Sequence, residues 1–265
     1  DHVFLFYETY NNEELEHIKF QLFDLDMNLL NDDDGTSVYD NVTPQLNPKL
    51  VSNDGFVYIA YRDLRDWVSY DVAVQKFDEF GNPQWGDGGV LIPLEWDDVV
   101  NDIIALPNGG CVVFWTGGDP NIPDLNIYYQ AFDSDGDTPD GWASSPQLLS
   151  DATHIQNKAI AADYGSGIFV MWEDYQSGNA DLYGQFISYD GSIMGDENGI
   201  PITTDDRDQY NAELTYNSNS HEILVVWENN VGTADNPDFD INGTIVDTEN
   251  LIFADVFGIV EEVSS

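Results

Sequence analysis

Residues 167–188 read GIFVMWEDYQSGNADLYGQFIS: an apolar stretch that ends at Trp172, a polar loop, and a second stretch of mixed polarity. Apolar and alternating runs of roughly four to eight residues, bounded by turn residues, predict β-strands. The loop between the two runs contains Ser, Gly and Asn, which are typical turn formers. This segment therefore predicts an antiparallel β-hairpin.

The same hairpin recurs about every 55 residues along the chain. Each copy has an apolar strand closed by an aromatic residue, and these residues are Tyr7, Tyr61, Trp115, Trp172 and Trp227. One position of the following strand is Gln21, Gln75, Gln130, Gln185 or, in the last copy, Thr244. A fixed period of this length predicts a repeat architecture.

Each copy also contains two shorter strands. One follows a turn rich in Asp, Asn and Gly, as at residues 89–92, and the other opens the next copy after an Asn at fixed register. These residues are Asn47, Asn101, Asn157 and Asn211. Only four copies of this opening strand are present, and we expect residues upstream of Asp1 to supply the remaining innermost strand; donation by a neighbouring subunit is the alternative.

A four-stranded antiparallel unit cannot bury both of its faces alone, whereas tandem units packed face to face can. We therefore predict an all-β chain that forms one β-propeller domain of about five four-stranded antiparallel blades. The approximate blades are residues 1–43, 44–97, 98–153, 154–207 and 208–265. A larger or incompletely closed propeller stays open, and each closing aromatic is expected to pack between adjacent blades.

The charge balance excludes several partners. The chain carries 50 acidic and 7 basic residues, for a net charge of −43. Nucleic acid is excluded, because its binding depends on Lys and Arg that neutralise phosphates. No apolar run approaches the length of a membrane helix, so no membrane insertion is expected. The acidity fits either calcium-binding carboxylates or solvation in a saline habitat.

The candidate calcium site is the segment DSDGDTPDG, which places Asp133, Asp135, Asp137 and Asp140 close together in one turn. Calcium takes six to eight oxygen ligands, roughly, and alternating carboxylates in a tight loop supply several of them. A solvated hairpin turn is the alternative interpretation. Calcium is the one cofactor that the sequence suggests.

Trp67 and Trp96 lie outside the strand-closing register, on segments expected to be loops. They are the candidate ligand-binding residues because exposed indoles stack on sugar rings, and structural packing is the alternative interpretation. Pairs of acids flank the same loops, Asp63 with Asp71 and Asp174 with Asp181. Each pair either closes its loop or holds an ion. We expect loop closure.

Two segments carry a resemblance to a known family: residues 172–185, WEDYQSGNADLYGQ, and residues 80–92, FGNPQWGDGGVLI. They resemble the tandem propeller repeats of large secreted bacterial surface proteins, in which W-E-D, D-I-Y-x-Q, a D-G-N turn and W-G-x-x-G-V recur. The likeness fades in the first copy, which has Tyr7 for Trp and His17 for Asp. Because such repeats commonly occur in proteins exported by type IX secretion, the resemblance implies a secreted or cell-surface location in a bacterium.

The sequence contains no G-x-S-x-G, H-E-x-x-H or phosphate-binding glycine loop. We therefore expect no enzyme, but a non-catalytic extracellular propeller for adhesion, recognition or assembly, whose partner is a glycan, a protein or further copies of itself. One alternative is a polysaccharide-acting enzyme, a glycoside hydrolase or lyase, on the same scaffold. Carboxyl groups with raised pKa values in one asymmetric site would favour that enzyme. The other alternative is a filament subunit that assembles by strand addition.

Overall fold

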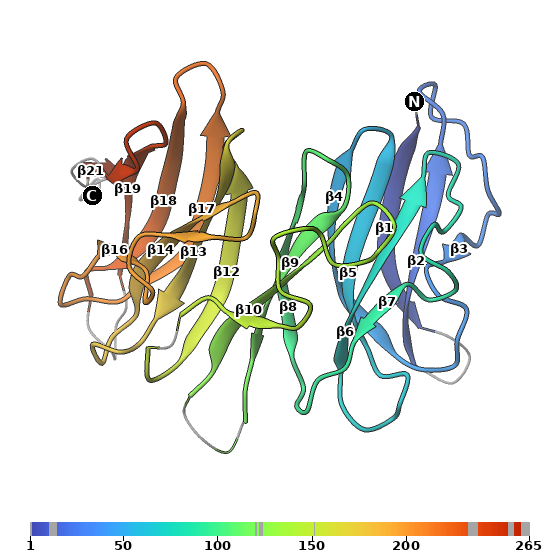
Figure 1. Cartoon of the computed structure of the whole chain (residues 1–265), viewed down its shortest axis with the longest axis horizontal. Helices are drawn as coiled ribbons and strands as arrows, with labels where there is room; N and C mark the ends of the chain where they lie inside the picture. Colours follow the sequence, from blue (N-terminus) through green and yellow to red (C-terminus); the bar gives the residue numbers. More distant parts are fainter. Residues whose placement is uncertain are drawn as a thin grey trace. The chain divides into compact units, whose positions relative to one another are not determined.

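The computed structural model describes residues 2–10, 15–119, 121, 124–150, 152–232 and 238–253, and the backbone of residues 257–260. Within these residues the strands form five sheets that follow one another along the sequence (Figure 1). The prediction of an all-β chain with five antiparallel blades is confirmed. None of the described segments is a helix long and apolar enough to cross a membrane.

The chain forms two compact units. The first consists of Asp1–Asp119 with Tyr129–Pro139, and the second of Pro120–Tyr128 with Asp140–Ser265. Blades 1 and 2 belong to the first unit and blades 4 and 5 to the second, while the strands of blade 3 are shared between them.

Blades 1 and 2 pack face to face. Blade 1 contains β1 (Val3–Tyr10), β2 (Glu16–Phe23) and β3 (Thr36–Ser37), and blade 2 contains β4 (Gln45–Asn53), β5 (Phe56–Asp63), β6 (Asp71–Asp78) and β7 (Val90–Ile92). Their shared core includes Phe20 of blade 1 and Tyr61 and Phe77 of blade 2. Tyr61 closes the second strand of its copy, so the predicted packing of this aromatic between blades is confirmed.

The third sheet has the order β11-β10-β9-β8. Its strands are β8 (Val99–Ala105), β9 (Cys111–Gly117), β10 (Asn126–Phe132) and β11 (Gln147–Leu148). Every residue of β9 is buried, including Cys111, which is fully inaccessible. Burial raises the pKa of the Cys111 thiol, because a buried thiolate loses its hydration. Cys111 is thus a core residue, as its apolar neighbours predict.

Blades 4 and 5 repeat the packing of blades 1 and 2. Blade 4 contains β12 (Gln156–Asp163), β13 (Gly167–Asp174), β14 (Asp181–Ser188), β15 (Ile193–Met194) and β16 (Ile200–Thr203), and blade 5 contains β17 (Gln209–Asn217), β18 (Glu222–Asn230), β19 (Phe239–Asp247), β20 (Ile252–Phe253) and β21 (Phe257–Val260). Phe169 and Met171 of blade 4 share a core with Trp227 of blade 5. Trp227 therefore also packs between blades.

The glutamine that recurs in β2, β6 and β14 fixes the segment that leads to the outermost strand of its blade. The Gln75 side chain donates to the Gly86 carbonyl at 2.8 Å and accepts from the Trp85 amide at 3.1 Å. Gln21 donates to the Asp33 carbonyl at 3.0 Å, and Gln185 donates to that of Asp196. An amide suits this position because it donates and accepts at once.

The asparagines at fixed register mark β-bulges at the start of the first strands. The pairing of β4 with β5 shifts between Leu46 and Lys49, and Asn47 within this shift has a φ of 56°. Asn211 has a φ of 49° in the equivalent bulge of blade 5. Asn adopts this left-handed conformation more easily than most residues. In blade 4, however, the left-handed residue is Lys158. The prediction that Asn157 stands at the same register as Asn47 and Asn211 is therefore wrong.

Candidate functional site

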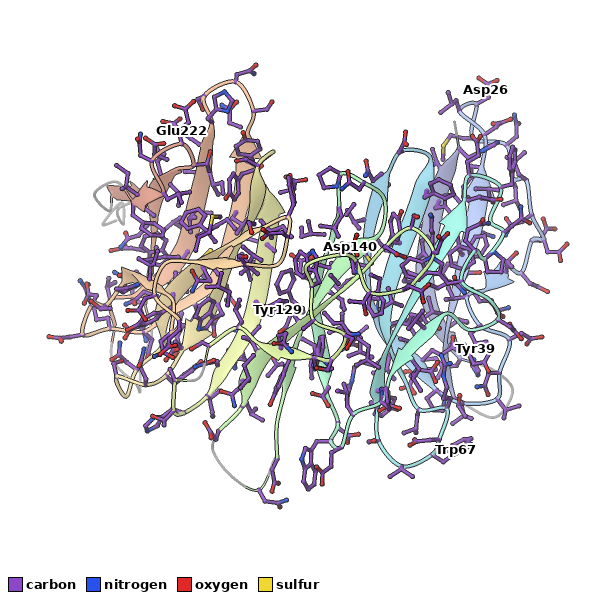
Figure 2. All side chains as sticks on the ribbon, in the orientation of Figure 1. Asp26, Tyr39, Trp67, Tyr129, Asp140 and Glu222 are labelled. Carbon is purple, nitrogen blue, oxygen red and sulfur yellow. The ribbon has the colours of Figure 1, made fainter. Side chains whose placement is uncertain are left out.

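Trp67 lies on the loop that joins β5 to β6, at the end of the blade where the first strand begins. Its side chain is 57% exposed and its φ is 60°. Figure 2 shows it at the opposite end of the first unit from Asp26. A left-handed conformation is rare for a bulky residue, and such strain concentrates at functional sites. The Asp66 carboxylate holds this turn by accepting the Val68 amide at 2.8 Å.

Trp96 lies on the segment that crosses from blade 2 to blade 3 and is half-buried. Several hydrogen bonds hold this segment against the Trp67 loop. The Ser69 hydroxyl donates to the Leu94 carbonyl at 3.3 Å, and the Tyr70 amide donates to the Asp97 carboxylate at 2.8 Å. The two predicted ligand-binding tryptophans therefore lie on neighbouring segments. We call the following residues the tryptophan–aspartate site: Trp67, Trp96, Arg62, Tyr70, Asp71, Asp97 and Asp98.

Asp98 is the unusual acid of this site. It is 3% exposed, and burial raises the pKa of its carboxyl to about 7, because the carboxylate form loses its hydration. The charges of Asp71 and Asp97 raise this pKa further, while the Arg62 guanidinium lowers it. Burial also raises the pKa of Asp71, whose carboxylate accepts the Leu94 amide at 2.8 Å. The site thus holds a carboxyl group that exchanges its proton near neutral pH.

Arg62 supplies positive charge to this acidic site. Its guanidinium carbon lies 4.4 Å from the centre of the Tyr70 ring. Burial lowers the pKa of Arg62, whereas the charges of Asp97 and Asp98 raise it. A cation held between an aromatic ring and carboxylates both offsets their charge and offers donors to a hydroxyl-rich ligand.

Comparison of the blades shows how sequence reasoning missed Asp98. Gln45 pairs with Asp63 and Gln156 with Asp174, and each of these aspartates lies two residues after the closing aromatic of its blade. In blade 3, Val99 pairs with Thr116, directly after the closing Trp115, so Asp98 stands one residue before Val99. Counted from the closing aromatics, Asp98 therefore stands at the register of three fully buried glutamines: Gln45, Gln156 and Gln209. An alignment of the first strands reveals this one carboxyl among amides, but not its raised pKa.

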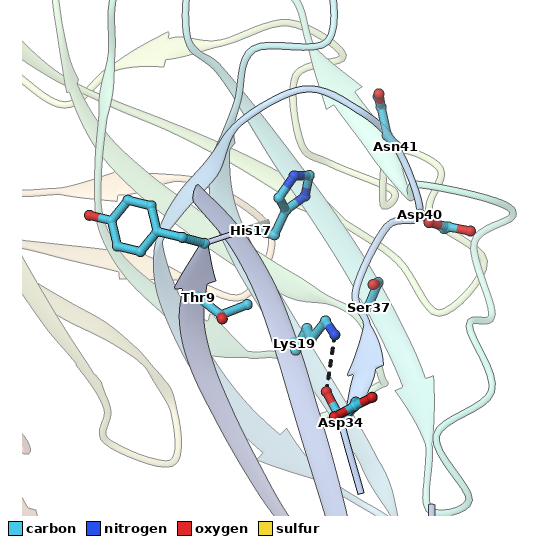
Figure 3. A pocket seen from close by; sticks show the side chains of 8 residues that line it. Thr9, His17, Lys19, Asp34, Ser37, Asp40 and Asn41 are labelled. Carbon is cyan, nitrogen blue, oxygen red and sulfur yellow. Dashed lines mark hydrogen bonds between the residues drawn. The ribbon is translucent and has the colours of Figure 1, made fainter. Parts of the chain in front are cut away.

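A polar pocket of about 430 Å³ lies on blade 1, and Figure 3 shows it from close by. It is lined by Thr9, His17, Lys19, Asp34, Asp40 and Asn41, among others. The Lys19 ammonium donates to the Asp34 carbonyl at 3.0 Å. Lys19 stands where blade 2 has the fully buried Ala73, so blade 1 carries a polar face where blade 2 carries an apolar one.

The candidate calcium residues are divided between the two units. Asp133, Asp135 and Asp137 share the turn after β10, where the Asp133 carboxylate accepts the amides of Asp135 at 2.9 Å and Asp137 at 3.0 Å. Asp140 belongs to the second unit. Among the described residues, no three His, Cys, Asp or Glu side chains are grouped to hold a metal ion. Calcium binding at this turn stays a prediction.

The acid pairs that flank the hairpin loops close those loops. The Asp63 carboxylate binds the Arg65 guanidinium at 2.8 Å. In blade 4, Asp174 accepts the Gln176 amide at 2.9 Å, and burial raises its pKa and that of Asp181. Loop closure, the interpretation favoured from the sequence, accounts for these contacts.

Neither a protein-family model nor a curated protein sequence matches the chain. Solved structures do match. An α-L-arabinanase of Penicillium chrysogenum with bound arabinobiose aligns at a TM-score of 0.54 and 10% identity, over 82% of this chain and 67% of that one. A thermostable family-43 glycoside hydrolase aligns at 0.51 and 12% identity, over 99% and 95%. An endo-arabinase of Bacteroides thetaiotaomicron VPI-5482 aligns at 0.50 and 12% identity, over 88% and 92%.

At identities this low the likeness shows the fold, which is that of a β-propeller. It also corrects one expectation. The absence of familiar catalytic motifs suggested that the chain is not an enzyme, but the structures of its fold named above are glycoside hydrolases. A motif search tests only for the local signatures that it contains, so their absence does not exclude an enzyme, whose activity depends on the geometry of a site.

Proposed function

We propose that the chain is a polysaccharide-acting enzyme of the glycoside hydrolase kind and that its substrate binds at the tryptophan–aspartate site. The observation that carries this proposal is the pKa of Asp98, about 7, in a site that also contains Asp71 and Asp97. Glycoside hydrolysis requires one carboxylic acid that donates a proton and a second, ionised carboxylate. Raising the pKa of the acid by burial is how such enzymes keep it protonated near neutral pH.

The residues of the site take distinct roles in this proposal. Asp98 holds the proton for the leaving oxygen, and the exposed Asp97 supplies the second carboxyl group. Trp67 presents its indole to a sugar ring, where an aromatic face covers the apolar side of the ring. Arg62 binds sugar hydroxyls. A polymer substrate of this kind agrees with the extracellular or cell-surface location that the repeat resemblance implies.

The solved structures suggest the first substrates to test, because two of them are arabinan-acting enzymes by name and one holds arabinobiose. Release of reducing sugar from arabinan, arabinoxylan and xylan measures the activity. We expect Asp98→Asn to lower kcat by at least about 100-fold, since it removes the proton donor. We expect Trp67→Ala mainly to raise KM, since stacking binds substrate and transition state alike.

Matched controls lie on the same unit. Asp26→Asn removes an exposed carboxylate from a turn at the opposite end, and Phe80→Ala removes an aromatic side chain that is 65% exposed. Both variants keep full activity in this proposal. Hydrolysis that survives Asp98→Asn unchanged excludes Asp98 as the acid, and a chain that cleaves none of these polymers contradicts the proposed activity on them.

A further inference from the structure

Three buried side chains form a row across the neighbouring strands β12, β13 and β14 of blade 4 (Figure 1). Gln156 of β12 pairs with Asp174 of β13, which in turn pairs with Asp181 of β14. Directly opposed residues of antiparallel strands project from the same face of the sheet, with Cβ atoms about 5 Å apart. All three residues are at most 1% exposed. Three oxygen-bearing side chains therefore lie next to one another, away from water.

One oxygen of this row accepts no hydrogen bond. The Gln156 amide nitrogen donates to the Ala152 carbonyl at 2.9 Å and to the Ser150 hydroxyl at 3.1 Å. Because a carbonyl only accepts, the contact with Ala152 fixes which end of the amide is the nitrogen. The Gln156 side-chain oxygen is then buried without a partner among the described residues. A buried acceptor of this kind calls for a bound donor or cation.

The two acids of the row carry charge that no neighbouring base balances. Burial raises the pKa of both carboxyl groups, and the charge of Asp181 raises that of Asp174 further. The charges of Asp205 and Asp208 raise the pKa of Asp181. His154 lowers the pKa of Asp174 by its charge, but it is exposed, and no Lys or Arg of the described chain forms an ion pair with either acid. Unbalanced carboxylates away from water are costly.

Blade 2 shows how the chain balances the same row elsewhere. Gln45, Asp63 and Asp71 are paired in the same order across β4, β5 and β6, and all are at most 2% exposed. There the Arg65 guanidinium contacts the Asp63 carboxylate at 2.8 Å and donates to the Gly88 carbonyl at 2.9 Å. Arg65 is thus a cation that the chain itself supplies to this row.

Blade 4 has no such cation. Gln176 stands at the register of Arg65, two residues after the aspartate of the second strand, and it is neutral and exposed. In blade 5 the row is Gln209, Asn229 and Asp240, so only one acid is present. The glutamine oxygen is without a partner in all three rows. Blade 4 alone combines this open oxygen with two acids and no cation.

We propose that the row of blade 4 binds a calcium ion through the carboxylates of Asp174 and Asp181 and the side-chain oxygen of Gln156. Calcium takes hard oxygen ligands, which carboxylates and amide carbonyls supply, and its two charges balance both acids. Such a site uses two carboxylates and one amide, so it does not require the group of three acids that the described residues lack. The ion links three adjacent strands and so stabilises the blade.

Calorimetric titration of the intact, chelator-treated chain with calcium measures the binding, in enough salt to suppress weak association with the acidic surface. We expect a saturable site and a melting temperature that rises with calcium, because the ion binds the folded chain. Asp181→Asn removes one charged ligand and weakens binding at least about 10-fold. Asp133→Asn, in the other candidate calcium turn, is the matched control and leaves this site unchanged.

Exchange of the two side chains at the Arg65 register gives a reciprocal pair of variants. Gln176→Arg places a guanidinium beside Asp174, as Arg65 lies beside Asp63, so we expect it to abolish the site and to raise the melting temperature in chelator. Arg65→Gln leaves blade 2 with two acids and an open glutamine oxygen, so we expect it to add a second calcium site.

Several results overturn the proposal. One is a melting temperature that is the same with calcium and with chelator, because the acids of the row then share a proton instead of binding an ion. Another is calcium binding that survives both Gln176→Arg and Asp181→Asn, or that Asp133→Asn abolishes. A folded Arg65→Gln chain that binds no second ion contradicts the argument from blade 2.

Discussion

β1 and β13 are copies of the same strand in different surroundings. In β13 every residue from Ile168 to Trp172 is at most 1% exposed, whereas in β1 Val3 is 40% and Leu5 53% exposed. Their sequences, VFLFY and IFVMW, are equally apolar. β13 lies between β12 and β14, while β1 has β2 on one side. The strands around a segment, and not its own composition, therefore decide how deeply it is buried.

The largest expected effect tests this difference directly. Trp172→Ala removes a fully buried ring from a complete blade, and we expect the free energy of unfolding to fall by about 3–5 kcal/mol. Tyr7→Ala, at the same register in blade 1, is expected to cost less than about half as much because Tyr7 is half-buried. Guanidinium unfolding followed by intrinsic fluorescence measures both. Equal losses would show that blade 1 is covered in solution.

A second comparison sets Asp98 against the glutamines at its register. The pKa of Asp98 is raised in the folded state to about 7, from an ordinary value of 3.8, so folding takes up a proton between these values. The contribution of Asp98 to the free energy of unfolding is therefore full below about pH 4 and is lost as the pH rises toward and through 7. Asp98→Asn keeps the shape of the protonated acid. We expect it to stabilise the chain by about 2–4 kcal/mol at pH 8 and by little at pH 4.

Thermal melts from pH 4 to pH 8 measure this effect, with Asp26→Asn as the matched control at an exposed turn. The control variant should keep the pH profile of the unsubstituted chain. If Asp98→Asn is no more stabilising at pH 8 than at pH 4, then Asp98 is ionised in the folded protein and loses its proposed role as an acid.

The smallest expected effect concerns the bulge of blade 4. Lys158→Asn introduces the residue that occupies the bulges of blades 2 and 5, which favours the left-handed backbone but removes the ion pair to Glu173. Because the Lys158 side chain is 54% exposed, the loss is expected to stay within about 1 kcal/mol. Lys158→Met removes the ion pair without the backbone gain and should cost more. Chemical unfolding of both variants decides the order.

Sequence reasoning reached the architecture because each blade repeats the same local signals. The closing aromatics predicted the contacts that Tyr61 and Trp227 make between blades, and the asparagines predicted the start of each first strand. The same reasoning placed Lys158 one residue out of register, because a bulge adds a residue without changing the polar pattern. It selected Trp67 and Trp96 but passed over Asp98, because Glu95 and Asp97 lie just before it and the sequence does not distinguish the three acids.

The sequence by itself determined that this chain builds antiparallel β-blades from a repeated unit, because the alternation of side chains along a strand and the residues of a turn act over a few neighbouring positions. Only the tertiary structure decided that the carboxyl of Asp98 is buried among other acids, so that its pKa rises to about 7, while Asp97 beside it in the sequence is exposed. Desolvation and strand pairing depend on segments far apart in the sequence, and local patterns carry no record of which segments meet.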